Sequence, residues 1–91
     1  MSQYNKLERG QVVISKCGRD KGKLQVVIDN LDDSYVLVVD GKRRKIEKPK
    51  KKKIKHLQKC NKLVDLTDIT DKKLRSYLNQ LTKEDQTDNV Q

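Results

Sequence analysis

The chain has 91 residues, a formal net charge of +9 at pH 7, and a charged fraction of 38%. A chain of this length forms one domain with a thin core, so a large cavity for a small-molecule substrate is not expected. It has one histidine, no recognisable nucleophile setting and no apolar run near the roughly 20 residues of a membrane span, so neither an enzyme nor a membrane protein is expected.

Alternating apolar residues predict three strands in the first half of the chain, after a polar lead-in over residues 1–8. The first strand covers Gly10–Lys16, and the glycine-rich stretch Gly18–Gly22 then turns the chain into a second strand over Lys23–Asp29. The third strand, Tyr35–Val39, is apolar on both faces and therefore needs a covering layer on each side.

The basic segment that follows is predicted to return as a hairpin. Asp40-Gly41 is typical of a two-residue turn, which leads into a fourth strand over Lys42–Glu47. Pro49 cannot donate to a ladder and ends that pairing. Lys50–Lys53 is then expected to be a mobile block of charge, and Ile54–Leu57 to form a short fifth strand.

The last third of the chain changes to helical spacing. Thr70 is a suitable N-cap, and a helix is predicted over Asp71–Leu81, with its apolar stripe covering the outer face of the third strand. That stripe consists of Leu74, Tyr77, Leu78 and Leu81. Residues 61–82 are assigned to a linker and this helix, and residues 83–91 to a disordered tail.

Five short strands with tight turns favour a closed or nearly closed barrel over residues 9–60, because closure removes exposed strand edges. The alternative is a flat four-stranded sheet, which would leave one side of the third strand dependent on the helix alone. The predicted fold class is therefore mainly β, a small barrel of about five strands followed by a C-terminal α-helix.

The positive charge is concentrated in residues 42–62. Residues 1–41 hold six basic and six acidic residues, residues 42–62 hold twelve and one, and residues 63–91 hold four and six. A neutral scaffold with a net +11 in one segment is suited to a polyanion, most often nucleic acid. The alternatives are a solvated charge run that aids solubility, or a nuclear-import signal.

The stretch from Gly10 to about Ile28 resembles a KOW motif, in which two alternating strands flank a glycine-containing loop. The matching residues are Gly10, Val13, Gly18, Lys21, Gly22 and Val27. Gln25 stands where a further glycine is often found. Asp33–Gln58 is similar to small bacterial KOW-domain RNA-binding proteins, which resemble the archaeal and eukaryotic-type large-subunit ribosomal protein fourteen family. The resemblance implies an SH3-like (KOW) barrel that binds ribosomal RNA or a ribosome-associated RNA.

The basic residues are the candidate RNA ligands. Alternation along the predicted fourth strand would place cations on both of its faces. The cations of the Gly18–Gly22 loop fit either phosphate contact or a plain connecting turn, and the resemblance favours contact. The predicted RNA-binding residues are Arg19, Lys21, Lys23, Lys42, Arg43, Arg44, Lys45, Lys48, Lys50, Lys51, Lys52, Lys53, Lys55 and His56.

Aromatic residues are scarce, since the chain has three tyrosines and neither Phe nor Trp. Tyr35 and Tyr77 are expected in the core, and Tyr4 is isolated. Proteins that stack single-stranded bases need an exposed aromatic platform, so recognition is expected to use the backbone and shape of folded RNA.

Neither a metal site nor a cofactor is expected. His56 and Cys60 are four residues apart and Cys17 could join them, but structural zinc needs four ligands in paired spacings. Without a signal-peptide h-region the protein is expected in the cytoplasm, with both cysteines reduced.

The leading interpretation is a cytoplasmic RNA-binding protein that associates with the ribosome and binds ribosomal RNA. The alternative is a protein-docking KOW module of a transcription or translation factor complex, in which the lysines only steer association. A nucleoid-type DNA binder is a third hypothesis, disfavoured because no recognition helix is predicted within the basic segment.

Overall fold

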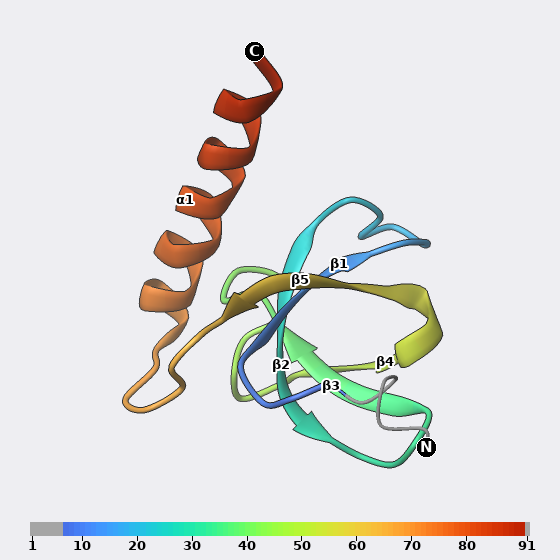
Figure 1. The fold of residues 1–91 in the computed structure, drawn as a ribbon. Helices are drawn as coiled ribbons and strands as arrows, with labels where there is room; N and C mark the ends of the chain where they lie inside the picture. Colours follow the sequence, from blue (N-terminus) through green and yellow to red (C-terminus); the bar gives the residue numbers. More distant parts are fainter. Residues whose placement is uncertain (1–6, 91) are drawn as a thin grey trace.

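The computed structural model describes the backbone of residues 7–90 and the side chains of residues 7–82 (Figure 1). Tyr4 and most of the predicted lead-in lie outside the described residues. The prediction of a mainly β chain with a C-terminal helix is confirmed. The elements are β1 (Gln11–Ser15), β2 (Leu24–Asn30), β3 (Tyr35–Val39), β4 (Lys50–Lys53), the 3-10 turn η2 (Ile54–His56), β5 (Leu57–Leu63) and α1 (Asp71–Val90).

The five strands form one antiparallel sheet in the order β4-β3-β2-β1-β5. Its two edge strands, β4 and β5, are consecutive in the chain and joined only by η2. In a flat sheet these edges would lie about 19 Å apart, whereas three residues of 3-10 helix advance the chain by about 6 Å. The sheet must therefore curl until its edges approach, which gives the barrel-like shape in Figure 1 and rules out a flat sheet.

Strand alternation divides the apolar residues into two layers. Val13, Val27, Val36 and Val38 face the interior of the curled sheet together with Leu57, and all are buried. Residues of the opposite face pack against α1. Burial of each Val or Leu side chain stabilises the folded state by about 1.5–3 kcal/mol. This helix-side layer includes Val12, Val26, Val39, Leu74 and Leu78. The inner face of β3 is covered as predicted, whereas on its outer face only Val39 joins the helix-side layer and Tyr35 and Leu37 stay half-buried.

The helix α1 begins at Asp71, as predicted, and packs through the predicted stripe. The hydroxyl of Thr70 accepts a 3.2 Å hydrogen bond from the amide of Lys73, which makes Thr70 the N-cap. The helix continues to Val90, beyond the predicted end at Leu81 and through most of the segment predicted to be a tail. Residues 82–90 contain neither glycine nor proline, so nothing in the sequence interrupts the helix.

The predicted fourth strand, Lys42–Glu47, is wrong, because residues 40–49 form a loop between β3 and β4. Oδ1 of Asp40 accepts hydrogen bonds from the amides of Lys42 (2.8 Å) and Arg44 (2.9 Å), so the chain closes on Asp40 and does not extend. The predicted alternation of Lys42–Lys45 across two sheet faces is therefore wrong as well. The amide of Ile46 then donates to Oδ1 of Asp71 at 2.9 Å, which fixes the loop to α1.

The fourth strand is instead the lysine run itself. Lys50–Lys53 pairs with residues 35–38 of β3, so the expectation of a mobile block is wrong. The apolar residues of β3 bury its backbone, so its N–H and C=O groups need partners on both edges of the strand. β2 pairs with one edge, and the backbone of the four lysines pairs with the other. The predicted fifth strand is also shifted: Ile54–His56 forms η2, and β5 runs from Leu57 to Leu63, past the expected barrel boundary at residue 60.

We predict that Gly41→Ala destabilises the protein by about 2–4 kcal/mol, because it combines backbone strain with a steric overlap. Gly41 has a φ of +77°, and a Cβ there would overlap the carbonyl oxygen of Asp71 in the first turn of α1. The control is Gly18→Ala, where φ is +80° but a Cβ would meet open space, so only strain of about 1 kcal/mol is expected. Urea unfolding of both variants measures the difference, and equal losses would show that loop and helix do not touch at Gly41.

Candidate nucleic-acid interface

The predicted RNA-binding residues differ in their exposure to solvent. The β1–β2 and β3–β4 loops, the outer face of β4, and η2 present most of the cations to solvent. The exposed residues are Arg19, Lys21, Lys23, Lys42, Arg43, Lys45, Lys48, Lys51, Lys53 and Lys55; Arg44, Lys50 and His56 are half-buried, and Lys52 is buried.

Asp20 joins the two basic loops. Its carboxylate has only 7% of its side-chain surface exposed, and Oδ2 lies 3.7 Å from Nζ of Lys50. Oδ1 lies 4.0 Å from Nη1 of Arg43, and Nε2 of Gln25 on β2 approaches Oδ2 to 3.5 Å. One buried anion therefore holds the β1–β2 loop against both the β3–β4 loop and β4. Sequence reasoning treated Asp20 only as part of a turn and missed this role.

Lys52 points into the interior of the curled sheet. It pairs with Val36, whose side chain belongs to the interior layer, and the residue is only 9% exposed. Its Nζ donates a 2.9 Å hydrogen bond to Oγ of Ser15, which donates in turn to the carbonyl of Cys17 at 3.0 Å. Because a buried ammonium is costly without a hydrogen-bond acceptor, Ser15 is what makes a lysine tolerable here. The charge of Lys52 is thus withdrawn from the surface and from contact with a ligand.

Lys51 and Lys53 lie on the opposite, outer face of β4, around the ring of Tyr35. Nζ of Lys51 is 4.5 Å from the ring centroid and Nζ of Lys53 is 6.0 Å from it. Such contacts contribute about 0.5–1 kcal/mol at exposed sites and hold two cations side by side. The predicted core position of Tyr35 is wrong, because its ring is half-buried and contacts lysines; Tyr77 is half-buried against the helix-side layer.

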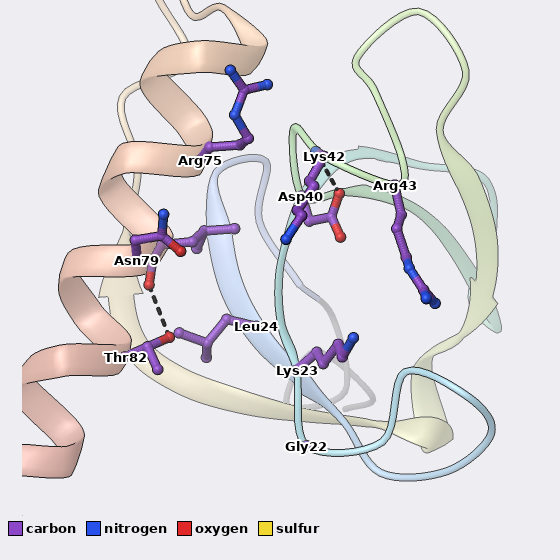
Figure 2. Close-up of a pocket in the computed structure, with 10 residues that line it drawn as sticks. Gly22, Lys23, Leu24, Asp40, Lys42, Arg43, Arg75, Asn79 and Thr82 are labelled. Carbon is purple, nitrogen blue, oxygen red and sulfur yellow. Dashed lines mark hydrogen bonds between the residues drawn. The ribbon is translucent and has the colours of Figure 1, made fainter.

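Cations from three elements meet at a surface pocket of about 550 Å³ between α1 and the two loops (Figure 2). The β1–β2 loop contributes Lys23, and the β3–β4 loop contributes Lys42 and Arg43. Arg75 of α1 completes the set, and its Nη1 donates a 2.8 Å hydrogen bond to the carbonyl of Gly41. Arg75 was missed because it lies outside the basic segment, and only its contact with a loop 34 residues away places it there.

A second hollow of about 380 Å³ lies beside η2 and also collects cations. Lys55 lines it together with Lys16 and Lys59, and Asp33 is the carboxylate among its lining residues. Lys16 and Lys59 were not predicted to bind RNA: Lys16 lies outside the basic segment, and only the antiparallel pairing of β1 with β5 brings the segment of Lys59 beside it.

The remaining predicted ligands are not drawn into these clusters. Within residues 7–82, the side chains of Arg19, Lys21, Lys45 and Lys48 neither line the two hollows nor share an ion pair with Asp20. The imidazole of His56 lies half-buried in η2, and its carbonyl accepts the amide of Lys16 at 2.8 Å. Residues 7–82 hold no cluster of three His, Cys, Asp or Glu side chains that could bind a metal ion.

A scan against protein-family models and a search of curated proteins found no match to this chain. The described part of the chain has no helix long and apolar enough to cross a membrane. Ammonium and guanidinium groups on two loops, one strand face and one helix can bind phosphate by charge and by hydrogen bonding.

We predict that Asp20→Asn lowers the free energy of unfolding by about 1–2 kcal/mol, since it leaves Lys50 and Arg43 without their anion. The effect is kept below that of a fully buried ion pair because Arg43 is largely exposed. Asp33→Asn is the matched control, because this substitution removes the same charge from an exposed position. Urea unfolding should show a loss for Asp20→Asn alone; equal stability of the two variants would contradict the bridging role.

Proposed function

We propose that this chain is an RNA-binding protein of the cytoplasm that associates with the ribosome and binds structured RNA, ribosomal RNA in particular. Its curled five-stranded sheet is proposed to be an SH3-like barrel of the KOW type. The strand order and the 3-10 turn between β4 and β5 are compatible with that identity.

The observation that carries the proposal is the meeting of Lys23, Lys42 and Arg43 from two separate loops at one pocket. Like charges repel, so a fold gains nothing in stability from gathering them at an exposed position. Asp40 is the carboxylate in the same lining, and its Oδ1 is already hydrogen-bonded to two backbone amides. Arg43 already lies 4.0 Å from the carboxylate of Asp20, so Lys23 and Lys42 are the lining cations that a polyanionic ligand would neutralise.

The residues on the outer face of β4 favour a ligand that is bound through its phosphates. Lys51 and Lys53 are exposed and lie about the ring of Tyr35, so that ring already contacts cations and is a poor platform for base stacking. Flexible ammonium groups suit phosphate oxygens, and folded RNA offers these at fixed positions.

We predict that Lys51→Met/Lys53→Met weakens RNA binding and makes its salt dependence shallower. Each lost phosphate contact should reduce the slope of log affinity against log salt by about 0.7–0.9. Lys52→Met is the matched control, since it removes a lysine charge from the same run but from the barrel interior. Fluorescence anisotropy with a hairpin RNA over a salt series should leave the slope of Lys52→Met unchanged.

Equal slopes for the wild type and both variants would overturn the proposed contact surface. Competition between hairpin RNA and duplex DNA at matched salt separates RNA from DNA binding. Association with the ribosome is tested by crosslinking in cells with sequencing of the bound RNA, and by gradient sedimentation with and without nuclease. Tight, nuclease-insensitive and salt-insensitive binding to a protein would instead favour the docking module.

A further inference from the structure

The pocket between α1 and the basic loops has chemistry that a phosphate site does not need. Its cations are Lys23, Lys42, Arg43 and Arg75, which together outnumber its single lining carboxylate, Asp40. Figure 2 shows that they extend from the two loops and from the helix, and that the Arg75 guanidinium, which is hydrogen-bonded to the carbonyl of Gly41, points away from Lys23. These four cations, which form the cationic rim of the pocket, would be sufficient to bind phosphate groups.

Two leucines add an apolar surface to the same pocket. Leu78 of α1 is buried and Leu24 of β2 is half-buried, and both line the hollow. They belong to the helix-side apolar layer, so their positions are fixed by the packing of α1 on the sheet. A ligand that used only charge would leave this surface wet, whereas a flat apolar group would cover it.

A polar helix residue stands beside the leucines. Asn79 is exposed, lines the pocket and makes no side-chain hydrogen bond to another described residue. Its amide can donate and accept at once, which is the pattern that hydrogen-bonds the edge of a base. Thr82, one turn further, donates its hydroxyl hydrogen to the carbonyl of Leu78 at 3.0 Å and keeps acceptor capacity.

We propose that this pocket receives one unpaired nucleotide of a structured RNA. Its base lies against Leu24 and Leu78, Asn79 hydrogen-bonds the base edge, and the cationic rim holds the flanking phosphates. A volume of about 550 Å³ is in the range of about 300–1,000 Å³ usual for small-ligand pockets. Paired bases are stacked within a helix and cannot enter, so the pocket selects a bulged or looped-out nucleotide. The inference rests on the proposed RNA-binding function and adds base recognition to it.

The test uses two hairpin RNAs of the same stem and loop, one fully paired and one with a single-nucleotide bulge. The full chain should bind the bulged hairpin about 10-fold more tightly, a difference typical of one well-placed base contact. Asn79→Ala should weaken binding to the bulged hairpin about 5-fold and leave binding to the paired hairpin unchanged. Gln80→Ala is the matched control, because Gln80 is exposed on the same helix and does not line the pocket.

A second readout is the NMR signals of the leucine methyls during titration with nucleoside monophosphates and with inorganic phosphate. Nucleotides should shift the methyls of Leu24 and Leu78, and phosphate should not. Equal affinity for both hairpins with no effect of Asn79→Ala, or leucine methyls unmoved by every nucleotide, would overturn the inference while leaving RNA binding intact. Failure to bind either hairpin would instead overturn the proposed function itself.

Discussion

Strand alternation directs two of the four lysines of β4 toward the interior of the curled sheet, and the fold depends on the partners that those two charges find there. Lys52 places its ammonium on the hydroxyl of Ser15, from β1, at 2.9 Å. Lys50 lies 3.7 Å from the buried carboxylate of Asp20. Because a buried charge without a partner is strongly unfavourable, these contacts are a condition for β4 to occupy the edge of the sheet. They also link β4 to β1 and to the β1–β2 loop.

The same contacts decide which cations remain for a ligand. Lys50 and Lys52 are used by the fold, whereas Lys51 and Lys53 emerge on the outer face beside Tyr35. Asp20 holds the two basic loops near each other, and the contact of Gly41 with α1 places a helix along one side of them. The interface thus depends on contacts inside the curled sheet as much as on the basic composition of residues 42–62.

The first three strands and the start of the helix could be predicted because their apolar residues repeat with a clear period. β3 was predicted with its observed bounds, and Thr70 was identified as the N-cap. The basic segment could not be predicted in the same way, since charged residues carry no apolar period. Asp40-Gly41 was misleading because the Asp40 carboxylate captures two later amides and forms a loop where a tight hairpin turn was expected.

The sequence predicted a basic site but not all of the residues that form it. The exposed cations of both loops follow from composition and turn chemistry, whereas Arg75 and Asn79 reach the pocket only through the packing of α1 on the sheet. That packing depends on contacts between residues far apart in the chain, such as the one between Gly41 and Arg75. The inward role of Lys52 likewise depends on the register of β4 against β3, which the uniform lysine run does not reveal.

A strand of four identical residues has no side-chain difference by which to choose its own alignment. Sliding β4 by one position would exchange its inner and outer lysines, and three of its four sites would still receive a lysine. The alignment must be set at the ends of the run, where the amide of Ile54 donates to the carbonyl of Ser34 at 2.8 Å and its side chain packs on the interior layer. Neighbouring residues, and not the lysines, thereby determine which half of a homopolymeric tract is structural and which half is free to meet a partner.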